Sequence, residues 1–330
     1  MTKYQLYEPG FGGPGGDVGL YVRIYQGVPL SHIPRPFRYR VLTPFLARAV
    51  PLPPHNLLRF FDMSPDKLIQ YRFGVVNMVA LVASGVLFVL YGRALGFDTF
   101  QALLCAFLFY TSLPVTNYGG SAMAEAWAWA FLLLGFWAAV DGRPAVLFFS
   151  SLIGGLAKEV TFLVIPAVLL LPGSARSKLV KLASVLPGIL VYTWFRFVLY
   201  PGGYGFASDP ATAMSNLLER LHDGPYYLWI LFDGATAFGL TVVFAAMGIW
   251  ALRRSPQSPL ARLAWLVPVV FFAPFFLGSN IGRIWFYAFP VVIPLAVVGI
   301  GRIWSEWTAG GGWGAGEADS AHPPPRASAA

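Results

Sequence analysis

The sequence predicts an all-α protein, a polytopic bundle of about nine transmembrane helices. Three observations lead to this fold class. The chain has 330 residues, of which 57% are hydrophobic and only 12% are charged, about half the charged fraction of a typical soluble domain. The mean hydropathy is +0.62. Apolar runs of about 17–22 residues recur along the chain, and each is long enough to cross the hydrocarbon core of a bilayer as a helix.

The predicted apolar segments lie between residues 73 and 303. They are 73–92, 99–116, 122–140, 144–157, 159–172, 182–200, 226–250, 263–278 and 285–303. The fourth and fifth are short and meet at residues 154–159. One uninterrupted helix over 144–172 would be about 43 Å long, too long for the hydrocarbon core, so we predict a tight helical hairpin. Residues 304–330 are rich in Gly, Ala, Ser and Pro, which predicts a disordered cytoplasmic tail.

The distribution of Lys and Arg predicts the orientation of the bundle. The opposite sides of the membrane receive very different numbers of cations. One set of loops holds Arg93, Arg143, Arg176, Lys178, Lys181, Arg253, Arg254, Arg262 and Arg302. The other loops between segments hold only Lys158, Arg220 and Arg283. Because cytoplasmic loops are enriched in Lys and Arg, the first set is cytoplasmic and residues 1–72 form an extracytoplasmic loop.

The N-terminal region carries many cations of its own, and exporting such a segment without a preceding apolar helix is unfavourable. We therefore expect one further transmembrane helix upstream of Met1. The DNA before the start codon tests this expectation, since it must encode an apolar stretch in the same frame. The positional pattern of the cations also explains the net charge of +8, so no nucleic-acid partner is expected.

A short amphipathic helix is predicted over residues 38–48, lying in the membrane interface with its arginines reaching the headgroups. Arg38 and Arg40 are candidates for binding the phosphate of a lipid-linked substrate, because guanidinium groups bind phosphate through two parallel hydrogen bonds. General attraction to anionic headgroups explains them equally well. His32 is a further candidate phosphate contact, with a solvated loop histidine as the alternative.

Asp17 is a lone acid that follows the Gly-rich stretch 12–16. It is a candidate general base, placed to take a proton from a hydroxyl nucleophile. A solvated turn aspartate is the alternative interpretation, since aspartate is common beside glycine in turns.

Ionisable residues also lie within or at the ends of the apolar segments, all on the predicted extracytoplasmic side. They are Glu125, Lys158, Glu159, Arg196, Asp233 and Arg283. Charges in a membrane are costly and are usually kept for a function. Their clustering on one side predicts a polar site that opens to the non-cytoplasmic surface.

Each of these charges also has a structural interpretation. Lys158 and Glu159 occupy the hairpin turn. In the functional interpretation Lys158 contacts a phosphate and Glu159 contacts an acceptor or a neighbouring arginine; in the structural one they form an ion pair that caps the turn. Arg196 is expected to lie at the depth of Asp233 and to pair with it. Glu125 lines the site or acts as a favourable charge at a helix N-terminus.

Three local patterns stand out once these residues are placed. An acid followed by a Tyr and a Gly turn marks the first outer loop. A Gly-rich hairpin ends in a Lys–acid pair, and a late outer-loop arginine stands beside aromatic residues and before a proline-containing segment. The residues concerned are Asp17, Tyr21 and Gly27; Gly154, Gly155, Lys158 and Glu159; and Arg283, Trp285, Tyr287 and Pro290.

In these patterns the chain resembles small bacterial members of the GT-C superfamily of membrane glycosyltransferases. That resemblance implies a multi-pass protein of the bacterial inner (plasma) membrane with its site facing the periplasm or exterior. It implies sugar transfer from a polyprenyl-phosphate donor to a lipid or glycan acceptor. Asp17 would be the catalytic base, and Lys158, Arg283, Arg38 and Arg40 would bind the donor phosphate.

The resemblance leaves the cofactor open. Asp17 stands alone instead of in an adjacent acidic pair, so the use of a divalent metal is undecided, and His and acidic residues do not cluster at metal-ligand spacing. The alternative function is a transporter or flippase of a lipid-linked or anionic solute, since buried charges also mark substrate paths. A third class, a non-catalytic assembly subunit, would use the same charges as structural pairs.

Overall fold

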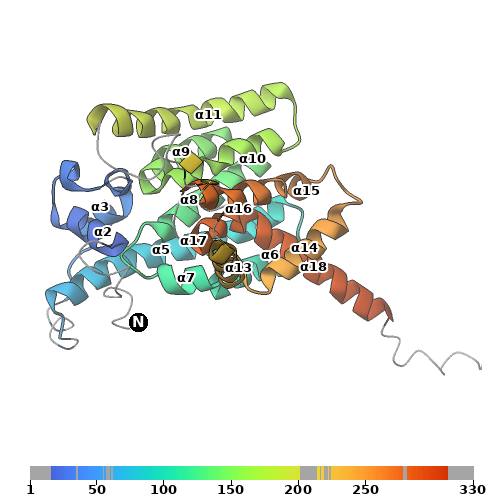
Figure 1. The fold of residues 1–330 in the computed structure, drawn as a ribbon, viewed down its shortest axis with the longest axis horizontal. Coiled ribbons are helices and arrows are strands. Elements are labelled where there is room, and N and C mark those ends of the chain that lie inside the picture. The colour runs from blue at the N-terminus through green and yellow to red at the C-terminus, as the bar shows by residue number, and fades with distance from the viewer. Residues whose placement is uncertain are drawn as a thin grey trace, which may run out of the picture.

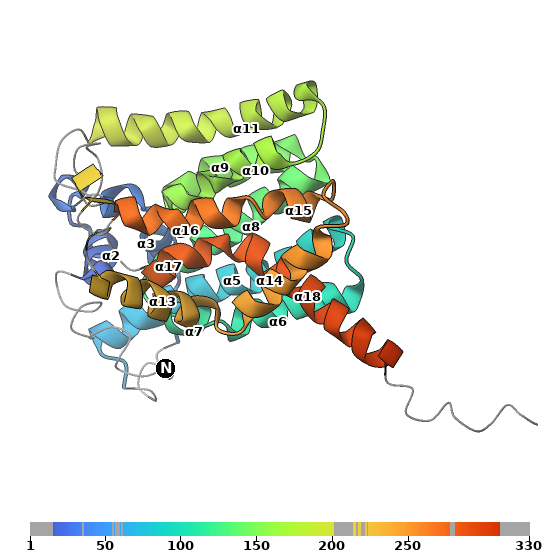
Figure 2. The same cartoon turned by 45° about the vertical axis from the view of Figure 1, so that its right-hand side comes forward.

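The computed structural model describes residues 16–34, 36–54, 56, 60, 62–200, 214–215, 217–218, 222, 224–277 and 281–310. Every regular element within these residues is a helix, and no strand occurs among them, so the all-α prediction is confirmed for this part of the chain. Figures 1 and 2 show the longer helices running side by side along the long axis of the molecule. The small helices α2 (Asp17–Gln26) and α3 (Leu42–Ala49) lie together at one end.

Among the described residues, the helical bundle has nine longer helices and the short elements between them. The longer helices are α5 (Pro65–Ala94), α6 (Thr99–Thr111), α8 (Glu125–Asp141), α9 (Pro144–Ala157), α11 (Ala175–Trp194), α13 (Gly224–Phe238), α14 (Thr241–Leu252), α16 (Leu266–Leu277) and α18 (Phe289–Gly310). The short elements are α7 (Leu113–Tyr118), η3 (Glu159–Leu163), α10 (Val164–Leu170), the π-helical turn η4 (Phe195–Leu199), α15 (Pro259–Leu263), α17 (Ile281–Trp285) and η5 (Phe286–Ala288).

Three stretches of the described chain are long and apolar enough to cross a membrane. They are Pro65–Ala94, Ala175–Leu199 and Arg283–Glu306. Shorter apolar helices accompany them, at Thr99–Thr111, Pro144–Ala157, Glu159–Leu170, Thr241–Leu252 and Pro259–Ala273. These lengths and compositions support a membrane-associated helical protein, and the count of nine spans remains a prediction.

Several predicted boundaries differ from the structure. The first span begins at Pro65 instead of residue 73, because Ser64 caps the helix by accepting a hydrogen bond from the Lys67 amide and proline suits the first helical position. The predicted boundary at residue 72 therefore falls inside α5. At the other end, α18 continues to Gly310, so residues 304–310 are helical and not part of a tail. Residues 311–330 lie outside the described residues.

Breaks divide two of the predicted segments, namely 99–116 and 226–250. In the first, Ser112 is extended and a new helix begins at Leu113 with Pro114 in its first turn, as expected for a proline near a helix N-terminus. In the second, Gly239 joins α13 to α14 with a φ of +54°, which favours glycine. Hydropathy counts apolar residues without regard to backbone direction, so it could not locate these breaks.

The predicted hairpin at residues 154–159 is present. Helix α9 ends at Ala157, Lys158 is extended, and η3 and α10 carry the chain back along the bundle. A Cβ atom on Gly154 would lie 2.8 Å from Phe131 Cβ and 2.9 Å from Thr161 Cγ2. Only glycine lets the turn pack this closely against α8.

Residues 16–54 form an N-terminal lobe, which the sequence treated as a loop with one interfacial helix. Besides α2 and α3 it contains two short turns, η1 (Leu30–His32) and η2 (Phe37–Tyr39). Its core of Tyr21, Ile24 and Ile33 packs with Phe73 of α5. Burial of these side chains fixes the lobe to one end of the bundle.

The interfacial helix predicted over residues 38–48 is wrong in one respect. The α-helix begins only at Leu42, and Arg38 and Arg40 are buried in the protein instead of reaching headgroups. Arg38 donates from Nε to the carbonyl oxygen of Ile33 at 2.8 Å. A mixed basic and apolar pattern does not reveal which basic side chains have partners inside the protein, and these two do.

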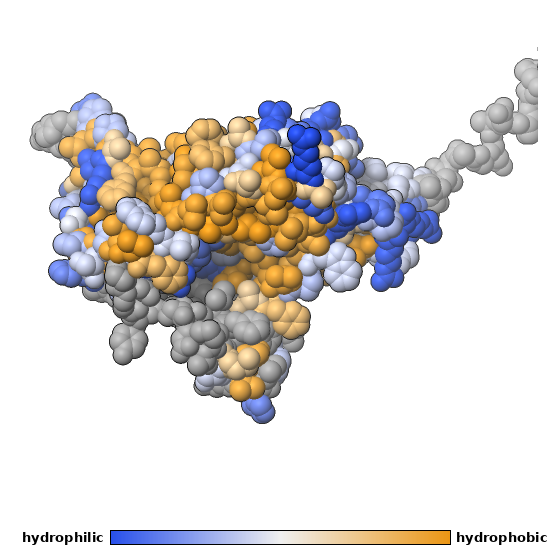
Figure 3. All heavy atoms as spheres, turned by 90° about the horizontal axis from the view of Figure 1, so that it is seen from above, coloured by the Kyte–Doolittle hydropathy of each residue, from blue (hydrophilic) through white to orange (hydrophobic). Residues whose placement is uncertain are grey.

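An extensive apolar surface surrounds the bundle. Figure 3 shows one face of the molecule, seen from above in the view of Figure 1, with a broad hydrophobic band across its middle and hydrophilic residues toward both ends. In the stretch Ala175–Leu199 only 11% of the most apolar window is buried, and Leu190, Phe197 and Val198 are exposed. Apolar surface of this extent is unfavourable in water and suits contact with lipid.

Helices α14 and α18 cross at unusually short range through Gly248 and Gly299. A Cβ atom on Gly248 would lie 1.9 Å from the carbonyl oxygen of Leu295, and one on Gly299 would lie 2.1 Å from that of Phe244. Small residues allow this close approach of helix backbones in membranes.

We expect Gly248→Ala to destabilise the protein by about 1–3 kcal/mol, because the methyl group meets backbone that cannot rotate away. Thermal unfolding in detergent measures the change. The matched control is Gly74→Ala in α5, where a Cβ atom meets nothing within 4 Å, and where alanine raises helix propensity by up to about 1 kcal/mol. Equal effects of the two substitutions would refute the close crossing.

Candidate functional site

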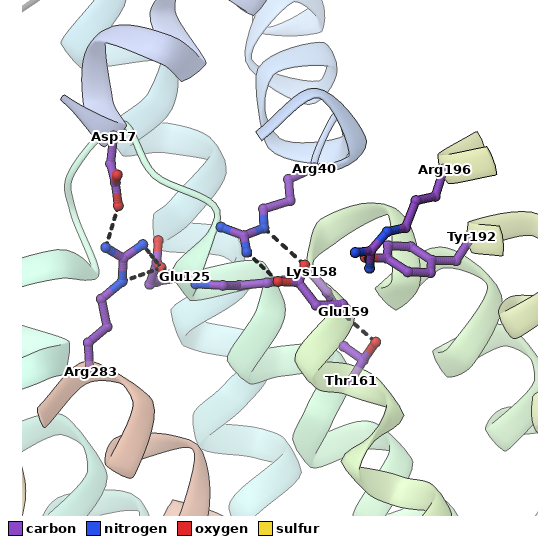
Figure 4. Close-up of polar contacts among 9 residues, drawn as sticks. All are labelled: Asp17, Arg40, Glu125, Lys158, Glu159, Thr161, Tyr192, Arg196 and Arg283. Atoms are coloured by element: carbon purple, nitrogen blue, oxygen red, sulfur yellow. Dashed lines mark hydrogen bonds and ion pairs between the residues drawn. The ribbon is translucent and has the colours of Figure 1, made fainter. Parts of the chain in front are cut away.

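Charged side chains from distant parts of the sequence meet where the N-terminal lobe covers the bundle (Figure 4). Arg283 of α17 lies at the centre. It donates from Nη1 to Asp17 of α2, and from Nε, at 2.7 Å, and Nη2 to one oxygen of Glu125. Asp17 is the first residue of α2 and not part of a flexible loop as predicted. One guanidinium group thus joins the lobe to the bundle.

Lys158 completes this group from the hairpin turn. Its Nζ donates to the same Glu125 oxygen, Oε1, at 2.6 Å. The extended backbone at Lys158 is held by its amide, which donates to the Gly154 carbonyl at 2.8 Å, and by Thr161, whose hydroxyl donates to the Lys158 carbonyl at 3.0 Å. Glu125 starts helix α8 and is fully buried, at 0% exposure, where the helix dipole also favours its charge.

A second ion pair lies beside the first group. Arg40, between η2 and α3, donates from Nε at 3.0 Å and from Nη2 to the two oxygens of Glu159. Burial opposes the charge on Arg40, but the adjacent Glu159 carboxylate and the Tyr21 hydroxyl together outweigh it and raise the pKa of Arg40 well above its ordinary value. The two-bond geometry is the arrangement in which guanidinium and carboxylate bind most strongly.

The cations and acids of this cluster differ in their access to the surface. Arg40, Lys158 and Arg283 are buried. The side chains of Asp17 and Glu159 are 27% and 35% exposed. A ligand would therefore meet a rim of carboxylates, with the positive charges behind them. We use the name charge cluster for Asp17, Arg40, Glu125, Lys158, Glu159 and Arg283.

Three other predicted site residues, Arg196, Arg38 and His32, stand apart from the charge cluster. Arg196 donates to the Tyr192 hydroxyl at 3.4 Å and lies on the far side of Glu159. The Asp233 side chain lies outside the described residues, so its predicted pairing with Arg196 stays a prediction. Arg38 holds the lobe backbone, and His32 is exposed without any contact to the charge cluster among the described residues.

Two tyrosines belong to the site although the sequence suggested no role of their own for them. Tyr21 and Tyr287 are buried, and the Lys158 amino group lies 5.1 Å from the centre of the Tyr287 ring. Their spacing was the available signal, since each stands four residues after Asp17 or Arg283, one helical turn further on.

No group of three or more His, Cys, Asp or Glu side chains that could hold a metal ion occurs within the part of the chain that the structure describes. The acids of the charge cluster have Arg or Lys as their partners instead. The use of a divalent metal therefore finds no ligand set in these residues.

No family model, curated protein or solved structure matches the chain. The functional argument therefore depends on the charge cluster and its surroundings.

Proposed function

We propose that the protein is a multi-pass membrane glycosyltransferase of GT-C-like architecture that moves a sugar from a polyprenyl-phosphate donor to a lipid or glycan acceptor. The observation that carries the proposal is the position of Arg283, which binds Asp17 and Glu125 at once while Lys158 binds the same Glu125. These ion pairs bring together a candidate base, Asp17, and two candidate phosphate ligands, Arg283 and Lys158, which are far apart in the sequence.

In the proposed donor site, the phosphate of the donor takes the place of a carboxylate beside an arginine. In the resting protein Asp17 and Glu159 occupy Arg283 and Arg40. Both acids are partly exposed, so a phosphate group that enters between them replaces a carboxylate as the partner of a guanidinium. Arg binds phosphate in the same bidentate manner, and Lys158 adds a third positive charge.

The proposed reaction is an inverting displacement. The acceptor hydroxyl attacks the anomeric carbon, its proton passes to Asp17, and the bond from that carbon to the phosphate oxygen breaks. Polyprenyl phosphate leaves with the electron pair, and the cations stabilise the charge that develops on its oxygen. Among the described contacts Arg283 uses only Oδ2 of Asp17, which leaves Oδ1 for the acceptor hydroxyl.

The surroundings of the site suit a lipid-borne donor. The prenyl chain needs an apolar surface, and the bundle presents one at α11. The proposed topology puts the charge cluster at the extracytoplasmic end of the spans, where a phosphate at the headgroup level would meet it. The predicted bacterial inner (plasma) membrane remains part of this proposal.

The direct test is turnover by the purified protein in lipid nanodiscs. Polyprenyl phosphate carrying a radiolabelled sugar is supplied together with membrane lipid acceptors, and both label transfer and release of polyprenyl phosphate are measured. Stoichiometric transfer and release are expected. Movement of the intact lipid-linked sugar across a liposome membrane, without cleavage, would instead establish the transporter or flippase alternative.

Lys158 makes donor binding sensitive to pH. Burial lowers the pKa of Lys158 to about 8. The carboxylates of Glu125 and Glu159 oppose this shift, and the cations Arg283 and Arg40 add to it. The amino group is therefore charged below about pH 8 and neutral above it. We expect the affinity for polyprenyl phosphate to fall roughly tenfold between pH 7 and pH 9, the size of one lost charge-assisted hydrogen bond.

Titration of bound polyprenyl phosphate by thermophoresis at several pH values measures this change. The Lys158→Arg variant is the control, because guanidinium stays protonated throughout the range. The same pH slope in wild type and Lys158→Arg would exclude Lys158 as the titrating group.

A further inference from the structure

The two oxygens of Glu125 have very different surroundings. Oε1 accepts hydrogen bonds from Lys158 Nζ and from Nε and Nη2 of Arg283. Oε2 is buried and accepts none from the described residues. Buried carboxylate oxygens almost always have partners, because desolvation without a hydrogen bond is costly. The crowded oxygen holds the cations in place, and the empty one is free to accept from a further donor.

Two hydroxyl groups near Glu125 are also buried. The phenol oxygen of Tyr287 has no hydrogen-bond partner among the described residues, and that of Tyr21 has none of regular hydrogen-bond geometry, although Arg40 interacts with it. Arg40 acts most strongly on the Tyr21 hydroxyl and Glu125 acts most strongly on the Tyr287 hydroxyl, which puts both phenols beside the charge cluster. Tyr21 comes from α2 of the N-terminal lobe and Tyr287 from η5 of the bundle, so they approach Glu125 from different elements.

Glu125 Oε2 and the two phenol oxygens differ from other buried polar atoms without a partner because they lie beside the charge cluster. Tyr91 also has a buried, unpaired hydroxyl, but it lies in the bundle core beside Phe136 and Cys105. No charged side chain is among its described contacts there. By contrast, Glu125 and the cations Arg40 and Arg283 act electrostatically on both Tyr21 and Tyr287, and the Lys158 amino group lies over the Tyr287 ring.

We propose that Glu125 Oε2, Tyr21 Oη and Tyr287 Oη form a subsite for hydroxyl groups of the transferred sugar. The inference rests on the proposed function and specifies its substrate class as a neutral, hydroxyl-rich ring. A sugar hydroxyl donates to Glu125 Oε2, while each phenol can donate to or accept from a neighbouring hydroxyl. A sugar that carries its own carboxylate is disfavoured, because it would face Glu125 at close range.

The test compares three lipids on the full chain in nanodiscs: polyprenyl phosphate, the same lipid carrying glucose, and the same lipid carrying glucuronic acid. We expect the glucosyl lipid to bind at least tenfold more tightly than the bare lipid, and the glucuronosyl lipid to gain nothing. Tyr21→Phe and Tyr287→Phe should each reduce the gain from glucose about three- to tenfold, as expected for one hydrogen bond. Both should leave the Kd of the bare lipid unchanged. Tyr91→Phe, the matched control, should change none of the three Kd values.

The outcomes separate this inference from the proposed function. Binding of the bare lipid without a gain from glucose, or an unchanged gain in both tyrosine variants, would overturn the subsite and leave the phosphate site intact. An equal gain from glucuronic acid would overturn the predicted substrate class. A loss of bare-lipid binding in the tyrosine variants would show a structural role instead. Failure of all three lipids to bind would overturn the proposed function together with the subsite.

Discussion

Replacing Glu125 with Gln is expected to lower the free energy of unfolding by about 3–5 kcal/mol, the usual cost of removing one member of a buried ion pair. The carboxylate is fully buried and is shared by Lys158 and Arg283. Glutamine keeps the shape but removes the charge. Two buried cations then face each other with no negative charge between them, and their repulsion adds to the lost hydrogen bonds.

Thermal and chemical unfolding in detergent measures the loss. The control is Glu306→Gln, which removes a carboxylate that is 62% exposed and pairs with Arg302 one turn away; exposed pairs contribute less than about 1 kcal/mol. A double substitution, Glu125→Gln with Lys158→Met, should recover part of the loss, because it removes one of the repelling charges. Wild-type stability in the single variant would mean that the ion pairs of Glu125 with Lys158 and Arg283 do not stabilise the fold.

Asp17→Asn is expected to reduce sugar transfer by about 10²–10⁴-fold, the contribution of a general base. Asparagine keeps a hydrogen-bonding side chain at the start of α2 but cannot take the proton from the acceptor hydroxyl. The side chain is only partly buried, so the loss of its pair with Arg283 should change stability by no more than about 1 kcal/mol. A large effect on activity with a small effect on folding is the signature that separates a catalytic from a structural acid.

The measurement is the rate of label transfer, alongside thermal unfolding of the same samples. Asp141→Asn is the matched control. Asp141 is also paired with an arginine, Arg143, and its side chain is 34% exposed. It lies at the end of α8 that is remote from Glu125 and the charge cluster. We expect normal transfer in that variant. Full activity of Asp17→Asn would remove Asp17 from the mechanism and leave the other residues of the charge cluster to be explained as structural pairs.

Local patterns in the sequence were enough to predict several elements of the fold. The hairpin at residues 154–159 followed from two glycines and a length argument, and the structure contains it with its turn at Lys158. The start of α5 was missed although Ser64 and Pro65 signal it, because hydropathy alone defined the segment. The breaks at Ser112 and Gly239 were also missed, since both lie inside continuous apolar runs.

The site was predicted as a set of charges but not as a set of contacts. Arg40 was expected at a headgroup and instead pairs with Glu159, more than a hundred residues away. Glu125 was considered as a helix-terminal charge, and its role as the shared partner of two cations could not be inferred. Partner choice depends on which helix ends meet in space, and no local spacing reports that.

Composition and the order of apolar segments determined by themselves that this chain is a helical protein suited to a membrane, because the cost of exposing apolar side chains to water depends on residue type and not on arrangement. Only the tertiary structure decided which charges face one another. A buried charge is stable only beside an opposite charge a few ångströms away. Glu125 and Arg283 are that close only because α8 and α17 meet in the bundle, and Asp17 reaches Arg283 only because the lobe packs against it.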